Sequence, residues 1–219
     1  FTSKLIGEIL RQKYRNTFVG GNIGNALCNS IIDKKKYSHH VVELSSFQLE
    51  TIRNFEPKIA ILLNLSKDHL DRYKNLKDYI SAKKKIFNTE RGKINLISLD
   101  DTYSNKIFNN KHIKNKISFS IMNTKANIYY KKGYIIDNYF YKNNKIKLLD
   151  ISLDLTNNYN LQNILAAYIV CRFLKIPIKF FNESIKKYKG LPHRSTVIFK
   201  SKTKLIINNS KATNISSAI

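Results

Sequence analysis

Cysteine is scarce in this chain of 219 residues, and tryptophan is absent. The two cysteines, Cys28 and Cys171, lack the spacing of a zinc site or of a disulfide framework. Both lie among apolar residues, where a free thiol behaves as a small buried side chain. The sequence therefore predicts two buried thiols in a cytoplasmic protein, and it excludes a disulfide-rich secreted scaffold.

Long apolar runs are also missing, and the mostly apolar stretch from Ile59 to Leu65 has the length of a strand. A membrane-spanning helix needs roughly 18 apolar residues in a row, so no membrane segment is expected. The chain shows no signal peptide and begins with Phe1 rather than Met, so the natural start is expected to lie upstream. The hydrophobic content of 42% is ample for one large domain, or for one domain with part of another.

Acidic residues are few: 15 stand against 39 basic residues, which gives a formal net charge of +24. Such an excess is typical of nucleic-acid-binding proteins, but also of the lysine-rich proteins of AT-rich genomes. Only seven of the 39 cations are arginine, the residue best suited to reading bases and phosphates, and the lysines are spread along the chain. We therefore expect no specific nucleic-acid partner, and the charge field suits anionic small substrates. A basic nucleic-acid-binding module is the alternative.

Apolar periodicity predicts strands that alternate with helices in the first half of the chain. The expected helices are residues 3–13 and 76–87, and the expected strands are residues 18–19, 41–44, 59–65 and 94–99. This alternation predicts an α/β fold with a mostly parallel sheet flanked by helices. The strand at residues 59–65 is apolar throughout, as expected of a parallel strand covered on both faces.

The second half of the chain begins with a different pattern. Residues 117–155 predict a small antiparallel β subdomain, because short aromatic and β-branched segments are separated by turn residues. Helices are then expected at residues 160–174, with Asn160 as the N-cap, and at residues 177–189, before Gly190. A last strand is expected at residues 204–207.

Glu43 raises the first functional question, because it ends an apolar strand where further apolar residues would be expected. Ligands of open α/β sheets bind at the carboxyl ends of the strands, and a carboxylate there suits a hard cation beside a phosphate. A salt-bridged strand-end acid is the alternative, since a buried carboxylate needs a partner in either case. The run NLSKDHLDRY (64–73) brings Asp68 and His69 to the end of the next strand, which favours ligands over a structural histidine.

Seven short segments occur in one order along the chain: GGNIGNAL, VVELSSFQLE, NLSKDHLDRY, YISAK, NLQNILAAY, GLPHR and NNSKATN. Together they resemble the ATP-dependent Mur ligase family over essentially the whole chain, and ELSSFQLE with SKATN is similar to its D-glutamate-adding branch. The resemblance implies a P-loop NTPase-like central ATPase domain at residues 1–189, lacking its phosphate loop. Residues 190–219 would be the hinge and opening of an incomplete Rossmann-like domain. A Mur ligase for a different amino acid is the alternative within the family.

The resemblance also implies a reaction. ATP would phosphorylate the terminal carboxylate of UDP-N-acetylmuramoyl-L-alanine, and the amine of D-glutamate would attack the acyl phosphate to form an amide in peptidoglycan synthesis. Mg²⁺, at two expected sites, would neutralise the phosphate oxygens. We expect a monomer that is inactive as this piece alone, because the phosphate loop and most of the D-glutamate domain are missing.

The resemblance assigns roles to individual residues. The implied metal ligands are Glu43, His69 and Lys83, the last as a carbamate formed with CO₂, and His69 and Lys83 are also the implied catalytic residues. The implied ATP contacts are Asn160, Asn163, His193, Arg194 and Asn209. The implied substrate contacts are Asn22, Ser45, Gln48, Ser210, Lys211 and Thr213. Asn209 departs from the family pattern, which has an aspartate in contact with ATP at that position.

Overall fold

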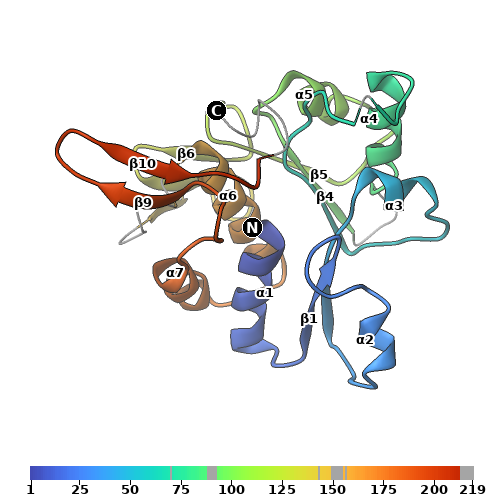
Figure 1. Cartoon of the computed structure of the whole chain (residues 1–219), viewed down its shortest axis with the longest axis horizontal. Coiled ribbons are helices and arrows are strands. Elements are labelled where there is room, and N and C mark those ends of the chain that lie inside the picture. Colours follow the sequence, from blue (N-terminus) through green and yellow to red (C-terminus); the bar gives the residue numbers. More distant parts are fainter. Residues whose placement is uncertain (70, 88–92, 143, 149–154, 156, 213–219) are drawn as a thin grey trace.

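The computed structural model describes residues 1–69, 71–87, 93–142, 144–148, 155 and 157–212. In this part of the chain the strands form three sheets (Figure 1). The first sheet pairs β1 (Thr17–Gly21) with β2 (His39–Glu43) in parallel. The second is a hairpin of β9 (Thr196–Lys200) and β10 (Leu205–Asn208), which projects from the body of the molecule.

The largest sheet has the strand order β3-β4-β5-β6-β7-β8. Its strands are Ile59–Leu62, Ile94–Ser98, Lys116–Ser120, Ile128–Lys131, Tyr134–Asp137 and Asn144–Lys147. The pairs from β3 to β6 are parallel, and the pairs from β6 to β8 are antiparallel. A run of parallel strands joined by helices is the expected consequence of the alternating pattern in the first half of the sequence.

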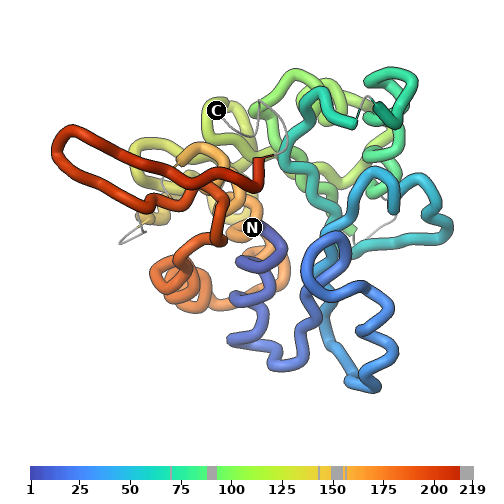
Figure 2. Tube along the Cα trace, viewed as in Figure 1, coloured from blue at the N-terminus to red at the C-terminus, as the bar shows by residue number. Residues whose placement is uncertain are grey.

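Seven helices lie within the described residues. They are α1 (Thr2–Lys13), α2 (Asn29–Ile32), α3 (Ser46–Glu50), α4 (Leu76–Lys84), α5 (Thr102–Phe108), α6 (Asn158–Phe173) and α7 (Ile178–Lys187). Figure 2 shows that α1, at the start of the chain, lies beside α6 and α7 from its second half. The molecule is therefore closed by contacts between segments far apart in the sequence.

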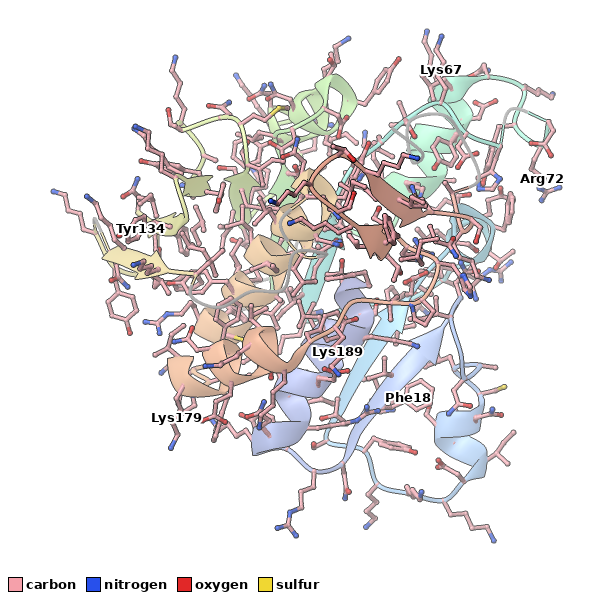
Figure 3. All side chains as sticks on the ribbon, turned by 60° about the vertical axis from the view of Figure 1, so that its left-hand side comes forward. Phe18, Lys67, Arg72, Tyr134, Lys179 and Lys189 are labelled. Atoms are coloured by element: carbon pink, nitrogen blue, oxygen red, sulfur yellow. The ribbon has the colours of Figure 1, made fainter. Side chains whose placement is uncertain are left out.

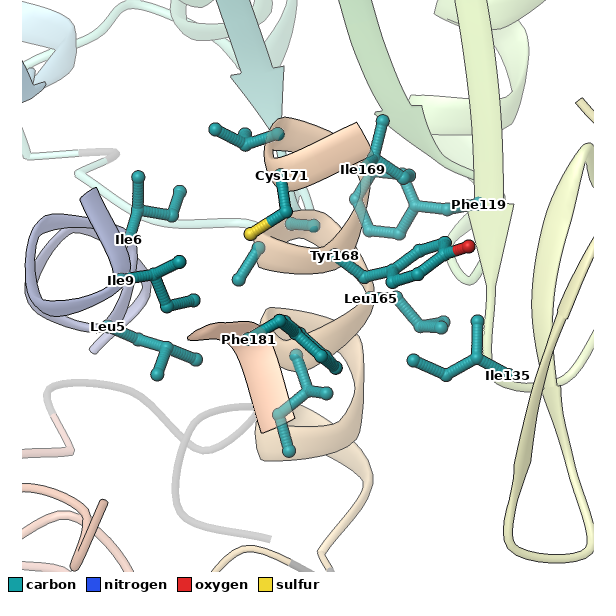
Figure 4. Packing of buried hydrophobic residues seen from close by; sticks show 14 of the residues in the cluster. Leu5, Ile6, Ile9, Phe119, Ile135, Leu165, Tyr168, Ile169, Cys171 and Phe181 are labelled. Carbon is teal, nitrogen blue, oxygen red and sulfur yellow. The ribbon is translucent and has the colours of Figure 1, made fainter. Parts of the chain in front are cut away.

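The main hydrophobic core surrounds α6. Most of this helix is buried, and it contacts α1 and α7 as well as β5 and β6 (Figure 4). A helix that is apolar around its whole circumference has to be covered on several sides, which explains its central place. Leu5, Ile6 and Ile9 of α1 meet it at helical spacing, and each is at most 5% exposed.

A second cluster packs α4 and α5 against β3 and β4. Its buried members include Tyr79 and Ala82 of α4, Ile107 of α5 and Ile97 of β4. This cluster holds α4 beside the carboxyl ends of the strands, where the implied site residues are expected.

The core also contains a buried carboxylate, Asp137, at the end of β7. Asp137 is fully buried, and Tyr168 of α6 donates to its Oδ2 at 2.7 Å. Its Oδ1 accepts from the backbone N–H groups of Tyr139 at 3.0 Å and Phe140 at 2.9 Å. These three donors satisfy a charge that would otherwise be costly to bury, and they join the antiparallel strands to α6.

The predicted α/β fold with a mostly parallel sheet flanked by helices is confirmed. The antiparallel part is smaller than expected, because β5 pairs in parallel with β4 and β6, and β6 to β8 continue the main sheet. The pattern of residues 117–120 could not distinguish these alternatives, since strand direction depends on the partner. Residues 149–154, also expected in this subdomain, lie outside the described residues.

Four local expectations were wrong. Asn160 lies inside α6, and the N-cap is Asn157, whose side chain accepts from the Asn160 N–H at 2.8 Å. Cys28 is exposed, whereas Cys171 is buried as expected. The third strand ends at Leu62, and its burial alternates, with Ala60 and Leu62 buried and Ile59 and Ile61 half-buried, so only one of its faces is fully covered. Helices α2, α3 and α5 and strand β9 were not foreseen.

No helix in the described part of the chain is both long enough and apolar enough to cross a bilayer.

The bond between Tyr168 and Asp137 yields a test of the core. Tyr168→Phe removes one donor to a buried carboxylate and keeps the ring, so we expect the free energy of unfolding to fall by about 1–3 kcal/mol in urea denaturation. Tyr134→Phe is the control, because Tyr134 is 36% exposed, and its change is expected to stay within about 0.5 kcal/mol. Equal losses in the two variants would show that the buried bond does not contribute in this way.

Candidate functional site

The loop after β1 depends on two glycines at the end of that strand, each of which lies close to a backbone oxygen. Gly21 has φ +102°, and a Cβ at this position would lie 2.3 Å from the backbone oxygen of Glu43. A Cβ at Gly20 would lie 2.2 Å from the backbone oxygen of Asn25. Only glycine permits both approaches. The Asn22 N–H then donates to the Glu43 carbonyl at 2.7 Å, so two of the implied site residues are neighbours.

Ser45 and Gln48 form the N-terminal cap of α3. The Gln48 N–H donates to Ser45 Oγ at 3.2 Å, and the Ser45 N–H donates to Gln48 Oε1 at 2.9 Å. This reciprocal pair is a capping box, and it gives both side chains a structural role at the start of the helix. Their contact with substrate remains a prediction.

His69 follows β3 in a left-handed backbone conformation, with φ +54°. Its N–H donates to Asp68 Oδ1 at 3.0 Å, and its Nε2 lies 3.8 Å from Asp68 Oδ2. The ring packs against Phe47 at 5.0 Å and Tyr79 at 6.1 Å between ring centres, and its side chain remains 43% exposed. The imidazole is thus positioned by two aromatic rings and one acid, and it is still open to solvent.

Lys83 of α4 lies in the same region as His69. Its Nζ lies 5.4 Å from the centre of the Tyr79 ring, the ring that also contacts His69. Burial lowers the pKa of Lys83, and the carboxylates of Asp68 and then Glu43 act in the opposite direction. Lys83 therefore lies within the field of acids from both strand ends. Lys85, by contrast, donates to the backbone oxygen of Glu50 at 2.6 Å.

The side chains of Glu43, Asp68, His69 and Lys83 supply only part of the ligand set that a hard cation needs. Within the described residues, no three His, Cys, Asp or Glu side chains are grouped so that they could hold a metal ion. Glu43 and Asp68 offer the carboxylate oxygens that Mg²⁺ prefers, both in the field of Lys83. A carbamate on Lys83 would add further oxygen ligands. The donor set therefore fits magnesium with carboxylate and carbamate oxygens, and it fits less well without the carbamate.

The N-terminal end of α1 lies close to this group. Phe1, just before α1, lies in the field of Glu43, Arg194 and Lys4. Glu43 and Arg194 are thus both near the first residue of the chain. Thr2 Oγ1 donates to Asn163 Oδ1, which ties the start of α1 to the start of α6.

The start of α6 is also fastened to the main sheet. Gln162 Nε2 donates to Ser98 Oγ at 2.8 Å and to Asp100 Oδ2 at 3.0 Å. Asn64, after β3, donates to Gln162 Oε1 at 3.5 Å. Sequence reasoning missed this network, because Gln162 stands between Asn160 and Asn163 and no apolar pattern sets it apart from these polar neighbours. The network holds Asn160 and its neighbours at the carboxyl ends of β3 and β4.

The segment before β9 and the loop after β10 are bonded to each other. The Lys211 N–H donates to the His193 carbonyl at 3.1 Å, and the Ser195 N–H donates to Asn209 Oδ1 at 3.2 Å. The Asn209 amide therefore accepts a backbone hydrogen bond, as the carboxylate of an aspartate also could. The Ser210 N–H closes the same turn by donating to Asn208 Oδ1 at 3.1 Å.

The implied site residues thus fall into two described groups. One lies at the strand ends, the starts of α1, α3 and α6, and the last turn of α4: Asn22, Glu43, Ser45, Gln48, His69, Lys83, Asn160, Asn163 and Arg194. The other lies at the base of the hairpin: His193, Asn209, Ser210 and Lys211. Thr213 lies outside the described residues. Asp68 had been noted at the strand end but given no role, and the structure places it beside His69 and Lys83.

Comparison with protein families gives a match to the Mur ligase middle domain over residues 2–171. Among curated relatives, UDP-N-acetylmuramoylalanine--D-glutamate ligase of Rickettsia bellii is 37% identical over 224 residues, which cover 100% of this chain and 48% of the relative. The enzyme of the same name from Staphylococcus aureus is 33% identical, over 97% of this chain and 46% of the relative. The chain therefore spans about half the length of these relatives.

Solved structures share the fold. UDP-N-acetylmuramoyl-L-alanyl-D-glutamate--2,6-diaminopimelate ligase has a TM-score of 0.70 at 22% identity, over 94% of this chain and 47% of that one. The MurF ligase of Thermotoga maritima in complex with ADP has a TM-score of 0.66 at 21% identity, and the match covers 95% of this chain and 50% of that one. At these identities the likeness concerns the fold alone.

The placement of Lys83 predicts how its titration responds to mutation. Because Asp68 and Glu43 both favour the charged amine, Asp68→Asn and Glu43→Gln should each lower the pKa of Lys83 further, Asp68→Asn more strongly. The neutral fraction at a given pH then rises, as does the reaction with CO₂. The side-chain NMR signal of Lys83, followed against pH, measures the shift.

The matched control is Asp71→Asn, since Asp71 is exposed and is not among the groups that act on Lys83. It should leave the titration of Lys83 unchanged. If Asp68→Asn and Glu43→Gln both behave like this control, the two carboxylates do not face the amine.

Proposed function

Because the chain belongs to the Mur ligase family, we propose that it is the central, ATP-using part of a ligase that joins D-glutamate to UDP-N-acetylmuramoyl-L-alanine. The reaction belongs to peptidoglycan synthesis in the cytoplasm. Residues 1–189 form the central domain in this proposal, and residues 190–219 form the hinge and the opening of a second domain. The curated relatives of this name, at up to 37% identity, support the choice of amino acid.

The observation that carries the proposal is the convergence around Lys83. A half-buried lysine in the field of Glu43 and Asp68, with its Nζ and the His69 ring both near the Tyr79 ring, has the composition of a catalytic centre rather than of a packed core. A structural lysine at the surface of a helix would have no reason to be buried beside two strand-end acids.

Each residue has a role in the proposed reaction. Glu43, His69 and the Lys83 carbamate would hold Mg²⁺, which when bound supplies positive charge against the phosphate oxygens. Burial favours the neutral amine of Lys83, which is the form that reacts with CO₂. Asp68 would hold the His69 side chain in place, since the His69 N–H donates to Asp68 Oδ1 and the imidazole Nε2 lies 3.8 Å from Asp68 Oδ2.

The remaining residues would bind and orient the two substrates. Asn160 and Asn163, fixed at the start of α6, together with His193, Arg194 and Asn209, would contact ATP. Asn22, Ser45 and Gln48 would contact the nucleotide-sugar substrate, and Ser210, Lys211 and Thr213 would meet it from the second domain. Arg194 supports this arrangement, because it lies near Glu43 and the start of α1 and could reach an anion bound between them.

A domain exchange tests the proposal. Residues 1–219 replace the matching 224-residue stretch of the Rickettsia bellii relative, and amide formation is measured with ATP, Mg²⁺ and UDP-N-acetylmuramoyl-L-alanine. We expect turnover with D-glutamate and none with L-lysine or meso-diaminopimelate. Turnover with either of these would favour a ligase for another amino acid. The 219-residue chain alone is expected to be inactive, and ligation by it alone would contradict that part of the proposal.

Variants of the exchanged enzyme test the metal ligands. Glu43→Ala and Lys83→Ala should each lower kcat by about 100-fold or more, because each removes charge that is aligned with the reacting phosphate. Added formate or acetate should partly restore Lys83→Ala by replacing the missing anion, and should not restore Glu43→Ala to the same extent. Glu183→Ala, on the exposed face of α7, is the control and should leave kcat unchanged. Near-normal turnover in both site variants would remove the assignment.

A further inference from the structure

A surface cleft of about 240 Å³ lies beside β1. It is separate from Glu43, Asp68, His69 and Lys83, which we call the proposed catalytic group. It is lined by Arg11, Arg15, Asn16, Thr17, Phe18, Val19, Asn25, Lys35 and Tyr37. None of these residues is assigned to the proposed ligase reaction. Three of the nine carry a positive charge, none carries a negative charge, and the rest offer amides, a hydroxyl, a phenol and apolar walls.

The three cations come from separate places in the sequence. Arg11 lies in the last turn of α1, Arg15 lies between α1 and β1, and Lys35 lies in the loop before β2. Like charges repel, so bringing three of them around one cleft is unfavourable unless an anion offsets them. The arginines are notable in this chain, because only seven of its 39 cations are arginine and two of those seven line this cleft.

The walls of the cleft are held in place by neighbouring groups. Arg11 Nε donates to the Thr17 carbonyl at 3.3 Å, which orients the guanidinium and leaves its two terminal nitrogens for another acceptor. The Tyr37 ring meets Phe18 edge to face, with ring centres 5.4 Å apart. Phe18 is 3% exposed, so this wall is anchored in the protein interior.

Two acids near the cleft reduce its positive charge, and neither is part of the lining. Glu8 of α1 interacts with Arg11. The Asp33 carboxylate accepts from the Tyr37 hydroxyl and from the Lys35 N–H, the latter at 3.2 Å, and so orients the phenol and the Lys35 backbone. Three cations beside two carboxylates still leave a positive excess.

The cleft runs along β1 from Thr17 to Val19 and reaches Asn25, whose backbone oxygen accepts from the Gly21 N–H, and none of its lining residues belongs to the proposed catalytic group. Thr17 begins β1, whereas Gly21 ends it opposite Glu43. Tyr37 lies just before β2. In Figure 3, Phe18 lies far from Lys67 and Arg72, which flank His69 in the sequence. A ligand of the cleft would thus not occupy the catalytic group.

We propose that this cleft binds a small phosphate-bearing anion with at least two negative charges, such as pyrophosphate or the terminal phosphates of a free nucleotide. Arginine offers paired N–H donors that match phosphate oxygens, and Lys35 adds a point charge. The volume of about 240 Å³ suits one or two phosphate groups, because sites for larger ligands enclose roughly 300–1,000 Å³. The Asn16 and Asn25 side chains supply further polar contacts at the edge of the cleft.

The test uses the 219-residue chain, ¹⁵N-labelled, titrated with pyrophosphate at 150 mM NaCl (about physiological ionic strength). We expect saturable shifts of the amide signals of Thr17, Phe18 and Tyr37, with a Kd below about 1 mM. The double variant Arg15→Gln/Lys35→Gln should weaken binding at least 10-fold, because both side chains are exposed at the cleft and can be changed without loss of the core. Arg15→Lys keeps the charge but loses the paired donors. Its affinity for pyrophosphate should lie between that of the unmodified chain and that of the double variant.

The matched control is Lys106→Gln/Lys179→Gln, which removes the same charge from exposed positions on α5 and α7. It should bind pyrophosphate as the unmodified chain does. An equal loss in both double variants would show a general charge effect and overturn the proposal. So would shifts confined to residues around Glu43 and Arg194, which would instead locate the anion at the proposed catalytic group.

A second arm distinguishes the source of the phosphate. ADP is titrated into the same samples, and the shifts at the cleft are compared with those from pyrophosphate. Tighter binding of ADP at the cleft would indicate a nucleotide, and equal or weaker binding would indicate an inorganic polyphosphate; both support a phosphate site. The absence of any shift at Thr17, Phe18 and Tyr37 with either ligand would refute it, whatever happens at the catalytic group.

Discussion

The burial of α6 is the interaction on which the rest of the structure depends. This helix is apolar around most of its surface, so α1, α7 and the strands β5 and β6 must all cover it. Each buried aliphatic or aromatic side chain contributes about 1.5–3 kcal/mol, whereas a typical hydrogen bond contributes about 1 kcal/mol. Packing therefore decides where the starts of α1 and α6 lie, and the Thr2–Asn163 and Gln162–Ser98 bonds refine a position that is already set.

The carboxyl ends of the strands become a site because this packing brings unrelated polar residues together. Lys83 is carried by α4, which the second cluster fixes against β3 and β4. Glu43 is carried by β2, whose end is set by the close approach of Gly21. Neither segment determines the other, yet the half-buried amine lies in the field of two acids. Those acids offset only part of the cost of burying Lys83 as a cation, so its pKa stays lowered.

Much of the fold could be predicted from the sequence, since α1, β1, β2, β4 and α7 follow from apolar spacing and from glycine or proline at their ends. Other features could not. The parallel pairing of β5 depends on its neighbours, which periodicity does not reveal. Asn157 rather than Asn160 caps α6, because three asparagines stand at positions 157, 158 and 160, within one turn, and only the backbone path selects among them. Cys28 lies among apolar residues in the sequence, yet the surface around α2 leaves it exposed.

The sequence by itself determined the family, the alternation of strands and helices, and the strand-end positions of Glu43 and His69, because these depend on residues that are close together along the chain. The grouping of Lys83 with Glu43 and Asp68, and of Arg11 with Arg15 and Lys35, was decided by the tertiary structure alone. The physical reason is that electrostatic interactions act over distances in space. Only the packed core brings residues from separate helices and loops within that range.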